Sequence, residues 1–286
     1  MKKRIDPGYL ISLLLSVVLA FVIGAVILAI AGFSPGKAYL AMLNGAFSSA
    51  RHIGDLLEYA MVLCLCGLAC VLGARVGIFN VGGEGQLLLG AIAACQVGVW
   101  LDGLTPWLVL PLAALAAMAA GGLYALIPGV LKVKVKVNEV ITTIMLNTVA
   151  ASFCQYLAKG PWKNANKNMV AATEQLNARY WFGGLIGGSN LSTAILAAAV
   201  LALVIWYVMQ KTSRGYEMKL TGQNERFARF IGIRTSRLVL VCMLLSGALC
   251  GLVGMFRVYG AEHLFRDSIS RDYYFEGLMV AMIARY

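Results

Sequence analysis

The sequence predicts an all-α fold, a polytopic transmembrane helical bundle with about 7–8 hydrophobic spans. Of the 286 residues, 60% are hydrophobic and only 13% are charged, whereas a soluble domain carries about a quarter of charged residues. The mean hydropathy is +0.79. Apolar runs of at least about 18 residues recur along the chain, and each can cross a hydrocarbon layer of roughly 30 Å as a helix. Lipid is therefore the expected solvent of most of the chain.

The first apolar run covers residues 9–32 and follows the basic residues Lys2, Lys3 and Arg4. It is longer than the apolar region of a signal peptide, about 7–15 residues, and no small-x-small cleavage site follows it. We therefore expect a retained first span. The mixed segment 33–53 that comes next predicts a short amphipathic helix outside the bilayer.

Six further spans follow, at residues 56–74, 87–101, 107–131, 140–158, 191–209 and 238–259, and a last apolar stretch starts at Tyr273. Lysines alternate with valines at residues 132–136. This alternation is compatible with a strand, but beside the end of a span we prefer a basic membrane anchor. The long polar connection 159–190 contains Trp162 and Trp181, which suit the membrane interface.

The distribution of basic residues predicts an N-terminus in the cytoplasm. With that orientation, more lysines and arginines fall in cytoplasmic segments than in outer ones, as the positive-inside rule requires. Joining the second and third runs into one broken element would change the odd-even count of spans. The formal charge of +11 does not indicate nucleic-acid binding, because the basic residues lie between apolar runs and no nucleic-acid motif accompanies them.

The residues that usually carry enzymatic or metal chemistry form no recognisable pattern. All seven cysteines lie in apolar runs, and neither His52 nor His263 stands near them at a metal-ligand spacing. We interpret the cysteines as small apolar packing residues, although a disulfide between distant spans stays open. The chain has neither a phosphate-binding loop nor a convincing catalytic pattern. We expect no cofactor in this chain, no enzymatic activity, and ATP hydrolysis only on another polypeptide.

A glycine-rich break near residues 77–86 is the most unusual stretch. Four glycines at residues 77–85 disfavour a continuous helix and leave backbone groups free. Backbone without helical hydrogen bonds is tolerated at membrane depth only where it is buried in protein or lines a polar cavity. One interpretation is a broken helix that lines a solute pathway. The other is a cytoplasmic turn in which Asn80 caps a helix and Glu84 is favoured by the helix dipole.

Polar residues near or within spans are the candidate site residues. We predict that Asn80, Glu84 and Gln86 are pathway or hinge residues and that Asn147 is a substrate contact, with an interhelical hydrogen bond as its alternative role. Glu139 follows Asn138 at the start of a span, where helix capping explains the pair. A small-xxx-small pattern predicts close helix packing at Gly247, Gly251 and Gly254.

Three stretches resemble the permease subunits of nucleoside-type ABC importers, which are relatives of the ribose and branched-chain amino acid permeases. The first is GIFNVGGEGQLLLGA at residues 77–91, and the second is NEVITTIMLN at residues 138–147. The third is GQNERFARFIGI at residues 222–233, continued by SGALCG at residues 246–251. Together they span most of the chain in the order found in the family.

The resemblance implies a pore-forming subunit of the inner membrane that moves a small polar solute, most readily a nucleoside, by alternating access. It implies a second permease subunit, cytoplasmic ABC ATPases that use ATP, and an extracytoplasmic substrate-binding lipoprotein, besides contact with membrane lipid. It also implies a coupling helix at residues 222–233, within a cytoplasmic loop at 211–237, whose contact residues are Gly222, Asn224, Glu225, Ala228 and Gly232. Open alternatives are a ribose-like sugar permease, an ion-coupled transporter that uses Glu84 or Glu139, and a structural scaffold.

The resemblance also concerns the end of the chain. We predict a single transmembrane permease domain over residues 1–286. Family members usually continue with further helices beyond the segment resembled by residues 275–284, and the run that starts at Tyr273 is too short to cross a bilayer. We therefore expect this domain to be incomplete at its C-terminal end.

Overall fold

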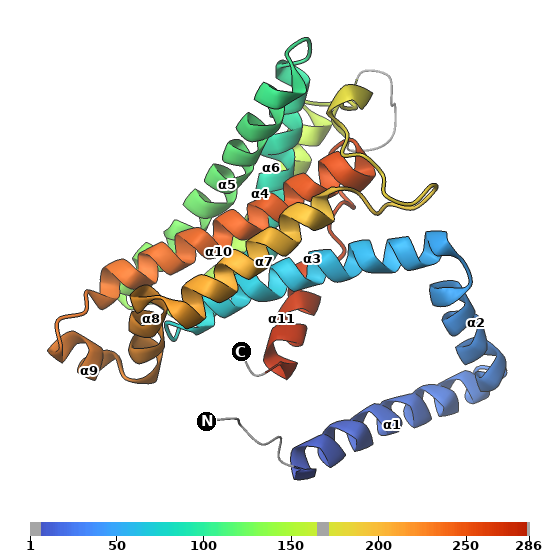
Figure 1. Ribbon diagram of the computed structural model, residues 1–286, viewed down its shortest axis with the longest axis horizontal. Helices are drawn as coiled ribbons and strands as arrows, with labels where there is room; N and C mark the ends of the chain where they lie inside the picture. Colours follow the sequence, from blue (N-terminus) through green and yellow to red (C-terminus); the bar gives the residue numbers. More distant parts are fainter. Residues whose placement is uncertain (1–6, 165–171, 285–286) are drawn as a thin grey trace. The chain divides into compact units, whose positions relative to one another are not determined.

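The computed structural model describes residues 7–164 and 172–284, and within these ranges every regular element is a helix (Figure 1). Six of the described helices are long and apolar enough to cross a membrane. The predicted all-helical transmembrane class is thus confirmed. The chain divides into two units, residues 1–53 and 54–286. Lys2, Lys3 and Arg4, on which the predicted orientation partly depends, lie outside the described residues.

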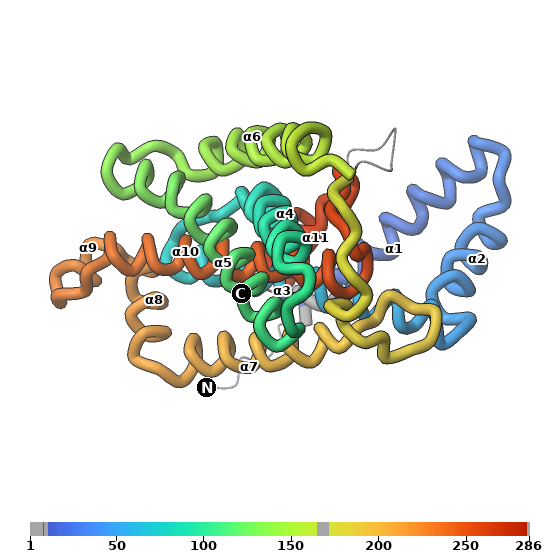
Figure 2. Tube along the Cα trace, turned by 90° about the horizontal axis from the view of Figure 1, so that it is seen from above, coloured from blue at the N-terminus to red at the C-terminus, as the bar shows by residue number. Residues whose placement is uncertain are grey.

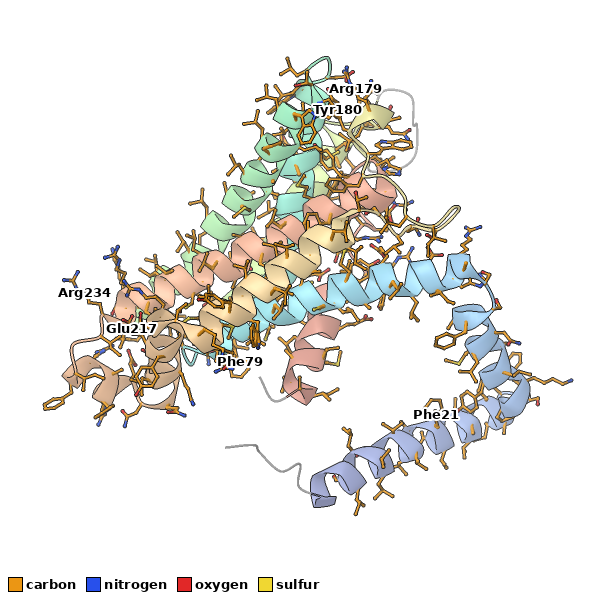
Figure 3. All side chains as sticks on the ribbon, viewed as in Figure 1. Phe21, Phe79, Arg179, Tyr180, Glu217 and Arg234 are labelled. Atoms are coloured by element: carbon orange, nitrogen blue, oxygen red, sulfur yellow. The ribbon has the colours of Figure 1, made fainter. Side chains whose placement is uncertain are left out.

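The first unit contains α1 (Pro7–Ile30) and α2 (Pro35–Phe47), joined by a tight turn. Gly32 has a φ of +82°, a conformation that L side chains disfavour, and Pro35 starts α2, where its missing N–H leaves no helix bond unmade. The Tyr39 hydroxyl donates to the Phe21 carbonyl at 2.6 Å, and the two rings meet edge to face. Figure 3 labels Phe21 on α1. The expected short helix after the first span is therefore present.

The second unit holds the bundle. Its helices are α3 (Ala50–Ala74, which begins in the first unit), α4 (Gly83–Trp100), α5 (Pro106–Val130), α6 (Glu139–Lys159), α7 (Ala194–Lys211), α8 (Ser213–Gln223), α9 (Glu225–Phe230), α10 (Thr235–Arg257) and α11 (Tyr273–Ile283). The π-helical turns η1 (Leu131–Val135) and η3 (Val258–Glu262) extend α5 and α10. The turn η2 (Ala178–Tyr180) lies in the long connection between α6 and α7, which is named the outer connection after the orientation that the sequence predicts. Figure 2 shows α6 and α7 on opposite sides of α4 and α10.

Glycines bring α4, α5 and α10 into backbone contact. A Cβ atom added to Gly251 of α10 would lie 2.1 Å from the Ala117 carbonyl oxygen of α5, and one added to Gly254 would lie 2.3 Å from the Leu87 carbonyl oxygen of α4. Gly247 approaches the Gly121 carbonyl oxygen in the same way, at 2.4 Å. In lipid, such close backbone approach is a main source of helix association.

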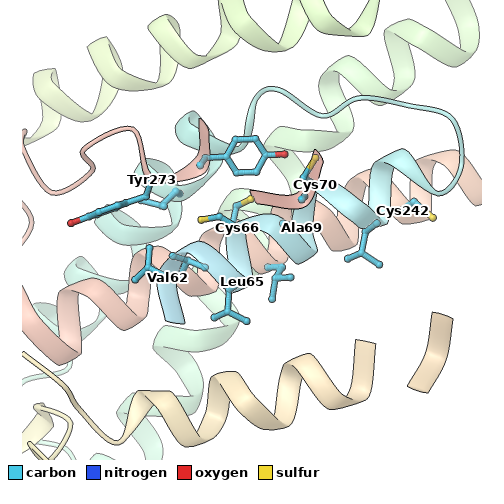
Figure 4. Packing of buried hydrophobic residues seen from close by; sticks show 14 of the residues in the cluster. Val62, Leu65, Cys66, Ala69, Cys70, Cys242 and Tyr273 are labelled. Carbon is cyan, nitrogen blue, oxygen red and sulfur yellow. The ribbon is translucent and has the colours of Figure 1, made fainter. Parts of the chain in front are cut away.

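Two clusters of buried apolar side chains complete the packing. One runs along α3 and joins it to α7, α10 and α11; Figure 4 shows its residues Val62, Leu65 and Cys66 of α3 with Cys242 of α10 and Tyr273 of α11. The other joins α4 to α5, α6 and the outer connection. The two clusters thus hold α4 and α10 against different neighbours.

The described part of the outer connection, between α6 and α7, is hydrogen-bonded to residues 259–265, which follow α10. Backbone N–H groups of Thr173, Leu176 and Phe182 donate to carbonyls of Phe265, His263 and Tyr259. Trp181 stacks on the His263 ring with centroids 3.7 Å apart. The backbone N–H of Thr193 donates to Gly183, which explains why α7 starts at Ala194 and later than the apolar run at residue 191 predicts.

Candidate functional site

The break between α3 and α4 forms a turn over residues 75–82. The N–H groups of Val76 and Ile78 both donate to the Gly73 carbonyl, and Gly77 has a φ of +78°. The interruption predicted near residues 77–86 is therefore present, but it is shorter than predicted, because residues 83–86 already belong to α4. Asn80 is not the N-cap of α4, because Gly82 holds that position.

Asn80 is fully buried, and both ends of its amide are paired. Its Nδ2 donates to Gln86 Oε1 at 2.9 Å and to Ser246 Oγ at 2.8 Å, and its Oδ1 accepts from Gln86 Nε2 and from the Gly82 N–H. Ser246 Oγ in turn donates to the Ala69 carbonyl at 2.7 Å. The network therefore links α3, the break, α4 and α10.

Glu84 connects the start of α4 to the start of α11. Its carboxylate accepts from the Tyr274 N–H at 3.2 Å and from the Ser270 hydroxyl. The Tyr274 hydroxyl donates to the Asn80 carbonyl. A carboxylate placed at two helix N-termini is stabilised by both helix dipoles. Glu84 therefore links the first turn of α4 to the first turn of α11.

Asn147 of α6 pairs with backbone groups that the break leaves without helical partners. Its Oδ1 accepts from the Gly85 N–H at 2.9 Å, and its Nδ2 donates to the Val81 carbonyl at 3.0 Å. The structure thus brings all four predicted site residues to the break. Asn147 acts there as an interhelical hydrogen-bonding residue, which was the alternative to substrate contact.

The break lies at the level of the middle of α10. Ser246, which Asn80 contacts, is about 16 Å along the helix axis from Thr235 at 1.5 Å per residue, in a helix that continues to Arg257. Further along, a Cβ added to Gly90 would lie 2.2 Å from the Gly251 Cα atom. The start of α4 is therefore enclosed by protein at bundle depth, as unwound backbone in a membrane requires.

The predicted helix cap at Asn138 is present at the start of α6. Asn138 accepts from the Val140 N–H at 2.9 Å and so caps α6, and Glu139 forms an ion pair with Lys132 at 2.7 Å. Residues 131–135 form a π-helical turn and not a strand. Lys136 then reverses the chain direction with a φ of +63°.

The predicted coupling segment is not one helix over residues 222–233. The helix α8 ends at Gln223, and Asn224 caps the separate helix α9 by accepting from the Phe227 N–H at 3.0 Å. Asparagine favours this cap over a helix interior because its side chain replaces a backbone acceptor. After α9, Gly232 turns the chain with a φ of +91°.

The α8–α9 segment joins the bundle through small and polar contacts. A Cβ added to Gly222 would lie 2.4 Å from the Arg75 carbonyl oxygen, at the start of the break. Ala228 is fully buried, and Arg229 pairs with Glu225 and donates to Thr235 Oγ1 at 2.9 Å. Figure 3 shows Glu217 and Arg234 at this end of the molecule. The segment therefore touches both the break and the start of α10.

Two charged residues inside spans were not singled out from the sequence. Glu58 of α3 and Arg257 of α10 are both buried and form an ion pair at 2.7 Å. The same rule that selected Glu84, that charges within spans are functional candidates, would have found them. Ser246 and Tyr274, which complete the network at the break, carry no comparable signal in the sequence.

Residues 52–286 match the family described as the permease component of the branched-chain amino acid transport system. The chain belongs to this family and is a multi-pass, pore-forming permease component, which is not itself an enzyme.

Individual relatives cover nearly the whole chain. It is 33% identical to the guanosine ABC transporter permease protein NupP of Bacillus subtilis over 99% of this chain and 81% of the relative. It is also 33% identical to the glucose ABC transporter permease protein TsgB13 of Haloferax volcanii, over 99% of this chain and 77% of that protein. With the nucleoside ABC transporter permease protein NupB of Lactococcus lactis it shares 30% identity over 94% of this chain and 76% of the relative. No solved structure matches the chain.

Proposed function

We propose that this chain is the membrane-spanning subunit of an ATP-driven importer that moves a nucleoside across the inner membrane. The observation that carries this proposal is its similarity, over 99% of its length, to a permease named for guanosine. A second relative named for nucleosides supports the same class of solute. The N-terminus is then cytoplasmic, and a substrate-binding lipoprotein delivers the solute from outside.

In this proposal, ATP is bound and hydrolysed by a cytoplasmic ATPase that docks on the α8–α9 segment. Asn224, Glu225, Ala228 and Gly232 shape this segment, and Gly222 contacts the break at Arg75. A rigid-body displacement of α8 and α9 would therefore reach the break directly, without an intervening flexible linker. A second permease subunit completes the path.

The network of Asn80, Glu84, Gln86 and Asn147 is the hinge of the alternating-access movement. It joins α3, α4, α6, α10 and α11 through hydrogen bonds, at a place where the backbone of α3 and α4 is interrupted. Short hydrogen-bonded breaks between rigid helices are suited to absorb a change in helix orientation. Solute moves past this hinge as the bundle changes state.

A sugar is the second candidate solute. The glucose permease relative matches the chain with the same 33% identity as the guanosine permease relative. A ribosyl group and a hexose both present vicinal hydroxyl groups, so one pathway chemistry serves either solute.

Uptake measurements test the proposal. Cells that express the chain with its ATPase, second permease and binding protein should accumulate radiolabelled guanosine, and depletion of ATP should abolish the accumulation. A protonophore applied while ATP is maintained should leave uptake in place. Uptake that survives ATP depletion and collapses with the ion gradient would instead indicate an ion-coupled transporter. Accumulation of glucose without guanosine would identify the sugar permease.

A further inference from the structure

A cavity of about 340 Å³ lies where the first half of α3, the end of α10 with η3, and the start of α11 meet. Three carboxylates and three guanidinium groups line it, and they are Asp55, Glu58, Glu262, Arg257, Arg266 and Arg271. The charged lining is therefore balanced in sign. A balanced lining favours an uncharged ligand that both donates and accepts hydrogen bonds.

The buried charges of this cavity form a chain of ion pairs. Arg257 Nη1 is 2.7 Å from Glu58 Oε1, and its Nη2 is 2.8 Å from Glu262 Oε1. Glu262 also pairs with Arg266. The Arg257 residue is only 5% exposed, and its Nε has no hydrogen-bond partner among the described residues. Burying such groups within a membrane span is costly, and where it occurs the residues usually serve a solute or ion path.

Aromatic rings form part of the same wall. Tyr59 and Tyr273 meet edge to face with centroids 5.4 Å apart, and the Arg257 guanidinium carbon is 5.1 Å from the centre of the Tyr273 ring. At the rim, the Asn190 N–H donates to Asp55 at 2.7 Å and holds the outer connection against α3. The cavity thus combines flat apolar faces with paired donors and acceptors, the combination that small-molecule sites use.

We propose that this cavity is a binding site for the transported solute and takes a neutral, polyhydroxylated ring compound, of which nucleosides and sugars are examples. The inference rests on the proposed function. Carboxylate and guanidinium pairs bind the vicinal hydroxyls, and the tyrosines pack against the ring. The volume lies in the range of about 300–1,000 Å³ that small-molecule sites occupy. A phosphorylated solute binds more weakly, because the charges of the lining balance and Arg257 and Arg266 are already paired with carboxylates, so that they offset little of the cost of removing a phosphate group from water.

The position of the cavity connects it to the hinge. Tyr273 lines the cavity, and the next residue, Tyr274, donates its N–H to Glu84 and its hydroxyl to the Asn80 carbonyl. A solute that displaces Tyr273 therefore acts on the first turn of α11 and through it on the break. This arrangement places solute binding next to the element that is proposed to move.

Thiol labelling of the complete transporter in whole cells tests this site. Asn190→Cys and Arg271→Cys place thiols at the rim, in a Cys64→Ser background because Cys64 is the exposed native cysteine. We expect an external, membrane-impermeant methanethiosulfonate to label both. An excess of guanosine or glucose should slow this labelling several-fold, whereas guanosine monophosphate should slow it much less. Arg179, which Figure 3 labels, pairs with Asp102 and is not among the residues that line the cavity. Arg179→Cys should therefore be labelled at the same rate with and without solute.

Several outcomes would overturn the site. These are failure of either rim thiol to be labelled from outside, no slowing by guanosine or glucose at either thiol, and equal slowing at Arg179→Cys, which would show a general closure. Equal slowing by guanosine monophosphate would overturn the neutral class of ligand. Uptake by the unaltered transporter separates the two proposals: uptake without protection refutes the cavity alone, and absence of uptake refutes the proposed function.

Discussion

At the scale of single residues, Asn80 shows how a polar group is tolerated in the middle of the bundle. It is fully buried, and its amide makes four hydrogen bonds. Replacement by alanine would leave the Gln86 amide and the Ser246 hydroxyl without these partners. Because an unsatisfied buried polar group costs about 1–3 kcal/mol, we expect Asn80→Ala to lower the free energy of unfolding by at least that amount.

Thermal unfolding of the purified protein in detergent measures this effect. Asn44→Ala is the matched control, because Asn44 is exposed on α2, and its effect should stay within about 0.5 kcal/mol. Similar melting temperatures for Asn80→Ala and Asn44→Ala would show that the network at the break contributes little to stability.

Glu84 is the residue whose loss should separate folding from transport. Its carboxylate holds the start of α11 through Tyr274 and Ser270. A hydrogen bond to a charged group contributes about 1.5–3 kcal/mol, so Glu84→Ala should reduce the population of a correctly joined hinge by roughly tenfold or more. We expect a matching loss of initial uptake rate at an unchanged amount of protein in the membrane.

The control for this measurement is Glu174→Ala, because Glu174 is exposed on the outer connection. Uptake by that variant should equal uptake by the unaltered chain. If Glu84→Ala also transports normally, Glu84 has no part in the mechanism.

His263 gives the outer connection a dependence on pH. Burial against Trp181 lowers the pKa of its imidazole below the ordinary value of 6.5. A lowered pKa means that the unpacked connection binds protons more strongly than the packed one, so its stability falls as pH drops below 6.5. In a variant that keeps Trp181 as its only tryptophan, we expect the Trp181 fluorescence to change with pH, with a midpoint below pH 6.5. This change should be lost in His263→Gln and retained in His52→Gln. A midpoint at or above 6.5 would contradict this prediction.

At the scale of elements, the small residues of α10 determine how closely the helices approach. A Cβ at Gly251 would meet the backbone of α5 at 2.1 Å, so one of the two helices must shift. Overpacking of this kind costs about 1–3 kcal/mol, and we expect Gly251→Ala to lower the melting temperature. Gly45→Ala is the matched control: Gly45 lies in α2 with no atom within 4 Å of the added Cβ, and alanine there should be neutral or slightly stabilising. Equal effects would refute the packing role.

Much of the element order could be predicted from the sequence, because spans in lipid must be long and apolar. A break was predictable as well, because four glycines at residues 77–85 disfavour one continuous helix; two of them, Gly83 and Gly85, nevertheless lie in the first turn of α4. Helix ends set by distant contacts were not predictable. The start of α7 depends on the bond between Thr193 and Gly183, and the separation of α8 from α9 depends on the side chain of Asn224. Helical structure at residues 222–233 was expected, but its division at a capping residue was missed, and the coupling role of the segment stays a prediction.

For the candidate site, the residues could be predicted from the sequence, but their contacts with one another could not. Asn80, Glu84, Gln86 and Asn147 stood out because polar groups in spans are rare. That they meet at one place follows from the packing of five helices, which the sequence does not display. Tyr274 lies 194 positions from its partner Asn80, and no spacing rule relates the two.

At the scale of the whole molecule, the break lies between the segment proposed to bind the ATPase and the cavity proposed to bind the solute. On one side, Gly222 of α8 contacts the Arg75 carbonyl at the start of the break. On the other side, Tyr274 of α11 joins the break to the cavity lined by Tyr273. An ATPase that moves α8 and α9 would therefore act on the same element as a solute that binds beside α11. Such a shared element is what reciprocal coupling between two sites requires.

Phe230 is the residue through which this coupling can be tested in the assembled transporter. It ends α9 with 90% of its surface exposed, and an aromatic ring in that position is typical of a protein contact. Phe230→Ala should leave the melting temperature of the isolated permease unchanged, because the side chain contributes little to the fold. Loss of a central aromatic anchor costs about 2 kcal/mol or more of binding energy, so we expect recovery of the ATPase on co-purification, and ATP-dependent uptake, to fall sharply. Trp107→Ala is the control: Trp107 is an aromatic residue of α5, outside the α8–α9 segment, with 91% exposure, and its replacement should leave ATPase recovery and uptake unchanged. Full recovery of the ATPase with Phe230→Ala would place the docking surface elsewhere than on α9.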